Sequence, residues 1–185
     1  MILQPRIEVG PRTLVVLVGP PGAGKSTWAR RHFQWSEIVS SDMFRMQLTD
    51  DANDMSVTRE VFQLVDRVAH ARLRHGRLTV LDSINGRPAR RRKLVQLAHQ
   101  LNSRAIAVSF QLPLEVCVSR DREREGRTLG TDTIARIWHD VLRDLANIDQ
   151  EGFDSVFSFK SDDDADRTAV ERLALDPASI EDAPA

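Results

Sequence analysis

The stretch that most constrains this chain is the segment Gly19–Thr27, with the sequence GPPGAGKST. It fits the pattern G-x-x-x-x-G-K-[ST], a glycine-rich turn followed by a lysine and a hydroxyl side chain. The run Leu14–Val18 before it is entirely aliphatic, as expected of a buried parallel strand. The segment Thr27–Phe33 after it is compatible with a helix. Strand, glycine loop and helix in this order predict a phosphate-binding P-loop.

The residue types of this loop explain how it would bind phosphate. Gly22 and Gly24 lack a Cβ, so their backbone can point successive N–H groups inward and form a cradle for anions. Lys25 is expected to reach the β- and γ-phosphates, and the Ser26 hydroxyl to bind Mg²⁺. The loop therefore predicts that the chain uses ATP and Mg²⁺. The residues of the segment expected to contact the nucleotide are Gly19, Gly22, Ala23, Gly24, Lys25, Ser26 and Thr27.

Short apolar runs alternate with helical patterns along the chain, which predicts an α/β fold. We expect a P-loop NTPase three-layer sandwich, with a parallel sheet of about five strands covered on both faces. The predicted strands are Leu14–Val18, Ser36–Asp42, Arg77–Asp82, Ala105–Leu112 and Phe153–Phe159. Apolar residues at helical spacing between Val57 and Leu73 predict a helix that serves the core. By analogy with nucleoside-kinase-like proteins, the expected strand order is 2-3-1-4-5.

The two ends of the chain carry weaker patterns. Met1–Pro11 is compatible with a short extra strand or with a loose arm. Asp162–Leu175 is predicted to be a last, acidic helix. We expect residues 1–175 to form a single P-loop domain and residues 176–185 to be a frayed tail.

Acidic side chains stand at the ends of two predicted strands. In open α/β sheets, ligands bind beyond the carboxyl ends of the strands. Asp82 is therefore placed to orient Mg²⁺, and Asp42 lies where a reacting group belongs. Arg45 follows Asp42 by about one helical turn. A second interpretation, in which Asp42 only caps the N-terminus of a helix, stays open.

Two basic segments indicate an anionic ligand or a solvated surface. The helix predicted from Pro88 carries five cations near its start: Arg87, Arg90, Arg91, Arg92 and Lys93. Cations there oppose the helix dipole, which hints at a bound anion. The segment Arg120–Arg127 holds four arginines among acidic residues. It is either a salt-bridged surface helix or an Arg-rich lid over a triphosphate, a role that suits the planar, always-charged guanidinium.

Composition narrows the class of protein. The 185 residues suit one α/β domain, and the single cysteine, Cys117, excludes an internal disulfide and a cysteine-based zinc cluster. The lack of a long apolar run and of a signal-peptide pattern leads us to expect a cytoplasmic protein without a membrane span. Residues 1–148 carry 23 basic against 16 acidic side chains, and residues 149–185 carry 3 against 11. A basic body suits a polyanionic partner.

Several motifs with set spacing carry a resemblance to a known family. They are Ser40-Ser41-Asp42-x-x-Arg45, Asp50-Asp51-x-Asn53-Asp54-x-x-Val57-Thr58, Arg77-Leu78-Thr79-Val80-x-Asp82, Leu112-Pro113-x-x-Val116-Cys117 and Arg120-x-x-x-Arg124-x-x-Arg127. In this order, over roughly residues 13–160, they resemble the 5′-kinase module of bacterial polynucleotide kinase-phosphatases. The chain departs from that module at Ser83-Ile84 and at Glu125-Gly126.

The resemblance implies transfer of the γ-phosphate of ATP to a 5′-hydroxyl end of RNA or DNA. It implies that Asp42 is the general base and that Arg45 clamps the acceptor. Ser26 and Asp82 would hold Mg²⁺. The other residues to which it gives a role in catalysis or nucleotide binding are Lys25, Arg120, Arg124 and Arg127. Two alternatives stay open: a kinase for a small molecule such as a sugar acid, nucleoside or antibiotic, and a non-catalytic nucleotide-gated binding module.

Overall fold

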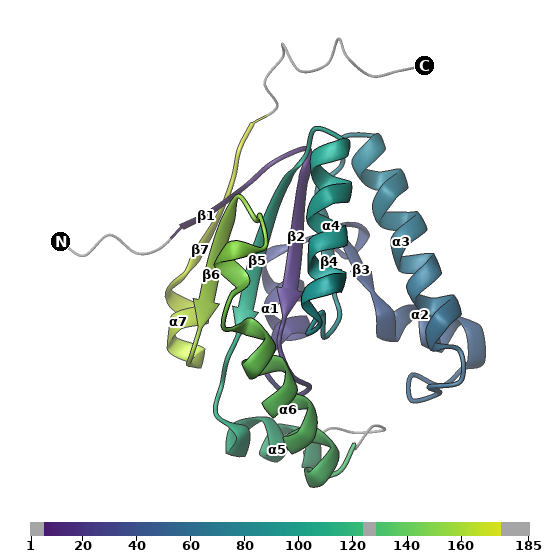
Figure 1. The fold of residues 1–185 in the computed structure, drawn as a ribbon, viewed down its shortest axis with the longest axis vertical. Helices are drawn as coiled ribbons and strands as arrows, with labels where there is room; N and C mark the ends of the chain where they lie inside the picture. The colour runs from purple at the N-terminus through teal and green to yellow at the C-terminus, as the bar shows by residue number, and fades with distance from the viewer. Residues whose placement is uncertain (1–5, 124–128, 175–185) are drawn as a thin grey trace, which may run out of the picture.

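A five-stranded parallel sheet forms the centre of the computed structural model, which describes residues 6–123 and 129–174 (Figure 1). The strand order is β3-β4-β2-β5-β6, and every neighbouring pair is parallel. Counted from the strand before the P-loop, this is the predicted order 2-3-1-4-5. The strands are β2 (Thr13–Val18), β3 (Ile38–Ser40), β4 (Thr79–Asp82), β5 (Arg104–Phe110) and β6 (Ser155–Phe159).

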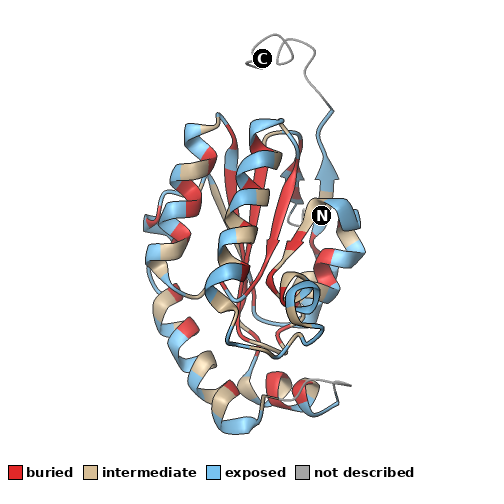
Figure 2. Ribbon diagram, turned by 90° about the vertical axis from the view of Figure 1, so that its right-hand side faces the viewer, coloured by how far each residue is buried: buried red, intermediate tan, exposed pale blue. Residues whose placement is uncertain are grey.

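Helices cover both faces of this sheet, as predicted for a three-layer sandwich. Side chains alternate along β2, so that Val15 and Leu17 pack into one core, while Leu14 and Val16 pack into the other. The first core includes Trp28 from α1, and the second includes residues of α3, α4 and α6. The red buried faces of the strands and helices therefore point toward each other in Figure 2. The helices are α1 (Lys25–His32), α2 (Ser41–Thr49), α3 (Thr58–Arg74), α4 (Pro88–Gln100), α5 (Leu114–Arg122), α6 (Thr131–Leu145) and α7 (Asp162–Arg167), with 3-10 turns at Trp35–Glu37 and Ile148–Gln150.

The predicted strand Ser36–Asp42 was too long. Only Ile38–Ser40 is extended, because a 3-10 turn precedes it and α2 begins immediately after it. Ser40 occupies the N-cap position of α2, so Asp42 lies within the first turn of the helix. The interpretation of Asp42 as the helix cap was therefore wrong.

The C-terminal prediction was also wrong beyond Arg167. Helix α7 ends there, and the chain continues as strand β7 (Ala169–Arg172), which pairs in parallel with β1 (Arg6–Val9). Of the two possibilities for the N-terminal segment, the extra strand is the one observed. Ile7 and Val9 of β1 are fully buried, so this pair of strands closes one edge of the core. The predicted frayed tail, residues 176–185, lies outside the described residues.

None of the helices among the described residues is long and apolar enough to cross a membrane.

Candidate active site

A cleft of about 740 Å³ lies where the P-loop, the carboxyl end of β4 and the start of α2 meet. Ligands of open α/β sheets bind at this edge. The cleft brings together most of the residues that sequence reasoning singled out. Those that line it are Gly22, Ala23, Gly24, Lys25, Ser26, Thr27, Asp42, Arg45, Asp82 and Arg120.

The P-loop adopts the curled backbone that its glycines predicted. Gly22 and Gly24 have φ angles of 78° and 89°, in the left-handed region that favours glycine. Gly24 is the N-cap of α1, and the first residues of that helix line the cleft, where a helix N-terminus favours anions. Lys25 is 8 % exposed, and its ammonium donates hydrogen bonds of 2.8 Å to the carbonyl oxygens of Gly19 and Pro20. These contacts hold its charge inside the loop.

The back of the P-loop packs directly on α5. A Cβ placed on Gly22 would lie 2.9 Å from the Cα of Cys117 and would collide with the carbonyl oxygen of the same residue. Cys117 is fully buried, and burial raises the pKa of its thiol. Cys117 is therefore a small core residue behind the P-loop.

Asp42 and Arg45 form a pair that lines the cleft. The Asp42 carboxylate accepts a hydrogen bond of 3.1 Å from Nη1 of Arg45, one turn later on α2. Arg45 is 3 % exposed, and its Nε is buried without a hydrogen-bond partner. Because an unsatisfied guanidinium N–H is costly to bury, this arginine is suited to receive an anionic group.

Asp82 ends β4 and is 7 % exposed, and it borders the same cleft as Ser26. A carboxylate and a hydroxyl are the hard oxygen donors that Mg²⁺ prefers. Within the described residues, no three His, Cys, Asp or Glu side chains gather closely enough to hold a metal ion on their own. This set fits Mg²⁺ bound by one or two protein oxygens together with water and phosphate oxygens.

The predicted lid is described only at its base. Arg120, near the end of α5, donates a hydrogen bond of 2.7 Å to Asp162 of α7, and its Nη1 lies close to Gly24. Arg31 of α1 also pairs with α7, through Asp166. The two remaining predicted nucleotide contacts, Arg124 and Arg127, lie outside the described residues. Arg120 is thus placed beside the P-loop, next to acidic residues of α7.

Comparison with known sequences identifies the family. The AAA domain family matches residues 14–148, which extend from β2 to the turn after α6. The chain belongs to this family. A curated adenylate kinase of Acidothermus cellulolyticus is 30% identical over 183 residues, covering 87% of this chain and 79% of the relative. This chain therefore has a kinase-like, nucleotide-binding P-loop fold.

Two further relatives are much longer than this chain. The transcription factor bHLH140 of Arabidopsis thaliana is 28% identical over 162 residues, covering 83% of this chain but only 16% of the plant protein. A chain in the solved Pnkp1/Rnl/Hen1 RNA repair complex has 24% sequence identity and a TM-score of 0.62. That match covers 83% of the present chain and 48% of the neighbour, and it shows a shared fold.

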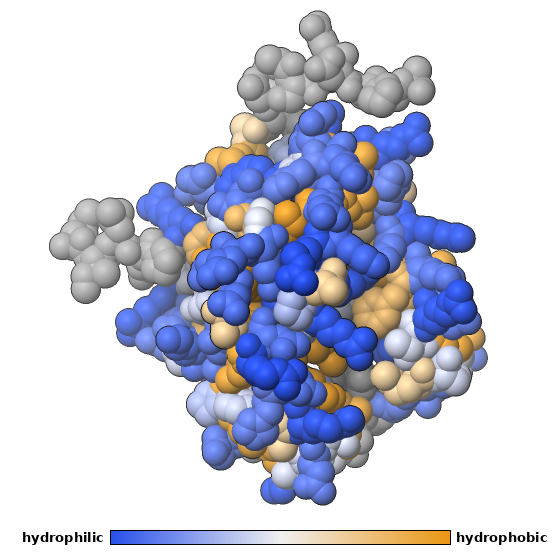
Figure 3. Space-filling model, viewed as in Figure 1, coloured by the Kyte–Doolittle hydropathy of each residue, from blue (hydrophilic) through white to orange (hydrophobic). Residues whose placement is uncertain are grey.

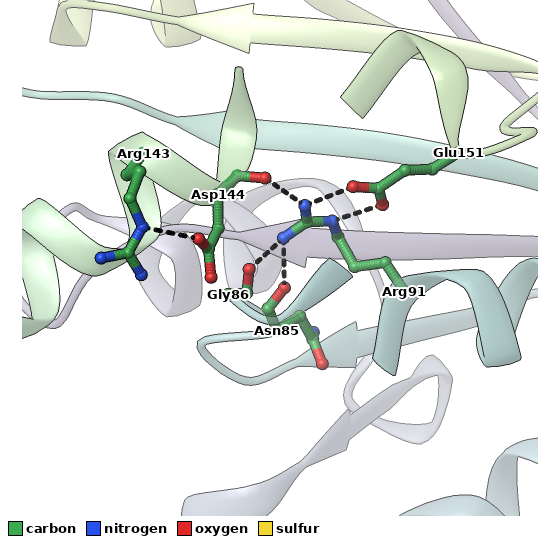
Figure 4. Close-up of polar contacts among 6 residues, drawn as sticks. All are labelled: Asn85, Gly86, Arg91, Arg143, Asp144 and Glu151. Carbon is green, nitrogen blue, oxygen red and sulfur yellow. Dashed lines mark hydrogen bonds and ion pairs between the residues drawn. The ribbon is translucent and has the colours of Figure 1, made fainter. Parts of the chain in front are cut away.

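The basic residues at the start of α4 differ in burial: one is buried in the core and others are exposed to solvent. Arg91 is fully buried and forms an ion pair with Glu151, with contacts of 2.7 and 2.5 Å (Figure 4). It also donates hydrogen bonds to the carbonyl oxygens of Asn85, Gly86 and Asp144. Arg91 is therefore structural and unavailable to a ligand, contrary to its grouping with an anion-binding cluster. Arg92 and Lys93 are exposed.

Sequence reasoning missed an apolar wall of the cleft. The helix between Val57 and Leu73 was predicted to serve only the core, but Thr58 and Phe62 from its start line the cleft. Met55 and Ile84 lie there too, and they are 59% and 37% exposed. One signal was available, because Phe62 is a large aromatic residue that stands off the apolar stripe through Val61 and Val65.

Proposed function

We propose that this protein is an ATP-dependent kinase that phosphorylates the 5′-hydroxyl end of RNA or DNA. The observation that carries the proposal is the Asp42–Arg45 pair, which borders the same cleft as the P-loop. A carboxylate there can accept the proton of a hydroxyl group, and a buried arginine beside it can hold a phosphate of the acceptor. The motifs from Ser40 to Arg127 that resemble a polynucleotide 5′-kinase module support this acceptor, as does the fold shared with a chain of an RNA repair complex.

In this mechanism the P-loop backbone and Lys25 bind the β- and γ-phosphates of ATP. Ser26 and Asp82 would hold Mg²⁺, which when bound would neutralise charge on the transferring phosphoryl group. Asp42 accepts the proton of the 5′-hydroxyl as the new bond from that oxygen to the γ-phosphorus forms. The bond from the γ-phosphorus to the bridging β–γ oxygen breaks, and ADP leaves. Arg45 orients the acceptor through its next phosphate.

The roles of the lid arginines follow the same logic. Arg120 lies beside Gly24 and is proposed to turn from Asp162 to the triphosphate when ATP binds. Arg124 and Arg127 are proposed to complete this charge neutralisation. Positioned cations of this kind stabilise the transition state because they meet charge where it develops.

The test is transfer of labelled γ-phosphate from Mg·ATP to a single-stranded 5′-hydroxyl oligonucleotide. We expect label on the wild-type product and a loss of about 10²-fold or more with Asp42→Asn, the scale of general-base catalysis. Binding of ATP to the variant, followed by Trp28 fluorescence, should persist because Asp42 lies outside the P-loop. Transfer by Asp42→Asn at the wild-type rate would refute the assignment of the base.

A second candidate is a kinase that phosphorylates a hydroxyl of a small molecule, such as a sugar acid, nucleoside or antibiotic. The 30% identity to an adenylate kinase over most of its length favours a small acceptor. The apolar wall formed by Met55, Phe62 and Ile84 could hold such a molecule. Intact ATP binding with no label on any oligonucleotide, but label on a member of a nucleoside and sugar panel, would favour this candidate.

A further inference from the structure

A second hollow, of about 370 Å³, lies between α3 and α4, which run side by side over one face of the sheet (Figure 1). Hydrophilic side chains dominate this face of the molecule, with apolar surface showing between them (Figure 3). We call the hollow the α3–α4 groove. Its lining residues are Asp66, Arg67, His70, Arg90, Lys93, Leu94 and Leu97. The proposed transfer reaction does not use any of them.

The α3–α4 groove carries a net positive charge from two side chains. Arg90 pairs with Asp66 through contacts of 2.7 and 2.5 Å, so these two residues cancel. Arg67 and Lys93 are both exposed, and within the described residues neither has a hydrogen-bond or ion-pair partner for its side chain. Two cations from neighbouring helices thus border one hollow. Their mutual repulsion is relieved when an anion joins them.

The α3–α4 groove begins where the wall of the active-site cleft ends. Phe62 lines the cleft, and the guanidinium of Arg90 lies over its ring at 5.2 Å from the ring centroid. Arg90 in turn lines the groove. At 1.5 Å of rise per helical residue, Arg67 lies about 7.5 Å beyond Phe62 along the axis of α3. A chain that leaves the cleft past Phe62 therefore reaches the two unpaired cations within a few nucleotides.

We propose that the α3–α4 groove binds the phosphodiester backbone of a single-stranded acceptor, beyond the nucleotide whose 5′-hydroxyl is phosphorylated. Arg67 and Lys93 contact phosphates, while the partly exposed Leu97 offers apolar surface to an unpaired sugar or base. Positively charged grooves follow the backbone of single strands in this way without reading their sequence. This inference rests on the proposed function for what occupies the cleft, and it adds a contact that a small acceptor could not make.

The first test measures binding rather than catalysis. A fluorescently labelled single strand of about twelve nucleotides, within the site sizes common for single-strand grooves, is titrated at several salt concentrations. The variant Arg67→Gln/Lys93→Gln is compared with the wild type and with Arg74→Gln/Arg92→Gln. The control removes the same charge from exposed positions on the same two helices, outside the groove lining. Thermal melts of both variants establish that they fold.

Removal of one cation that binds a phosphate lowers the slope of log affinity against log salt by about 0.7 for a single strand. We expect the slope of the groove variant to fall by about 1.4, since two such cations are removed, and that of the control to remain at the wild-type value. Equal slopes for the two variants would overturn the proposal, because the effect would then depend on net charge and not on the groove.

The second test separates this inference from the proposed function. KM is measured for transfer to a 5′-hydroxyl dinucleotide and to the longer strand. The groove variant should raise the ratio of the longer strand's KM to that of the dinucleotide by about tenfold, from two exposed charge contacts, and the control should not. An unchanged KM ratio in an active enzyme would overturn the proposed role of the groove but not the proposed function. Absence of transfer to both acceptors would overturn the proposed function, and the salt slope would then decide the groove independently.

Discussion

At the scale of single residues, Gly22 shows that one position can serve two requirements. Its positive φ angle lets the P-loop curl, and its missing Cβ lets the loop lie against the backbone of α5 at Cys117. The motif pattern in the sequence indicates only the first requirement. The second depends on packing against a residue 95 positions later, so it becomes visible only once the chain has folded.

We predict that Gly22→Ala destabilises the protein more than Gly76→Ala does. Both glycines have a positive φ angle, 78° and 63°, so both substitutions carry a backbone cost of about 1–2 kcal/mol. A Cβ on Gly76 meets the flexible Arg12 side chain at an ordinary contact distance of 3.6 Å, whereas one on Gly22 meets the Cys117 backbone. The collision should add about 1–3 kcal/mol, measured by urea denaturation. Equal losses for the two variants would contradict the packing argument.

The role of Arg91 cannot be read from its charge and its basic neighbours alone. Its basic neighbours suggest an anion-binding cluster, but it stands three, four and seven residues before Leu94, Val95 and Ala98, which are all buried. That spacing places it on the inner face of α4. The helical spacing of Arg91 relative to the buried apolar residues therefore indicated that it is buried. The charge of its side chain argued against that interpretation. The buried partner, Glu151, is 60 residues away and could not be assigned from the sequence.

At the scale of elements, Arg91 joins four segments at one point. Its guanidinium connects α4 to the loop after β4, through Asn85 and Gly86, and to the end of α6, through Asp144. Glu151 adds the turn before β6. The loop after β4 also supplies Ser83 and Ile84 to the wall of the cleft. The position of that wall is therefore tied to the helix that follows the predicted lid.

We predict that Arg91→Met and Glu151→Gln each cost about 3–5 kcal/mol of stability, because each leaves a buried charge unpaired. Arg91 is fully buried and Glu151 is 7% exposed, so solvent does not screen the pair. The double variant Arg91→Met/Glu151→Gln should lose less than the sum of the single losses. Arg92→Met, at the exposed next position, is the control and should change stability by less than about 0.5 kcal/mol. Urea unfolding measures all four, and additive losses would argue against a coupled pair.

The elements that the sequence predicted well are the long, fully buried ones. Strand β2 is buried at all six positions, and α3 has four buried residues at helical spacing. Strand β7 was missed because three of its four residues are exposed, and its pattern shows no alternation between buried and exposed sides. It is extended because β1, at the opposite end of the chain, supplies its hydrogen-bond partners. Such a non-local cause leaves no pattern in the local sequence.

At the scale of the whole molecule, the alternation of strands and helices predicted a parallel sheet covered on both faces, whereas the order of its strands came from an analogy with nucleoside-kinase-like proteins. The acceptor could not be predicted from the sequence, because the cleft wall at Met55, Phe62 and Ile84 is built from three segments that are separate in the sequence. The contacts made by the C-terminal strand β7 could not be predicted from the local sequence either. Arg172 of β7 binds Glu37 through contacts of 2.6 and 2.7 Å, which connects the added two-stranded sheet to the turn before β3.

We predict that this connection makes stability depend on pH in the acid range. Burial alone would raise the pKa of Glu37, but hydrogen bonds from Arg172 and from the Gln34 backbone, with the nearby arginine charges, lower it below 4.5 overall. A lowered folded-state pKa gives stability that is present above about pH 4.5 and lost as pH falls through the folded value. The stability difference between wild type and Glu37→Gln should therefore shrink between pH 5 and about pH 3.

Urea unfolding at several pH values measures this difference. Glu8→Gln, at an exposed position on β1, is the matched control, and its difference from wild type should change less over the same range. A Glu37→Gln difference that stays constant down to about pH 3 would show that the carboxylate charge contributes nothing to the connection.

The parallel pairing of β1 with β7 also has a mechanical consequence. The chain enters β1 at its first residue and leaves β7 at its last, and the two strands run in the same direction. A force that pulls the two ends apart along these strands loads their hydrogen bonds together, in shear, instead of opening them one after another. Tension applied through a fused neighbour would therefore meet this pair before it reached the five-stranded sheet. The strands that hold the nucleotide cleft would be shielded from that load.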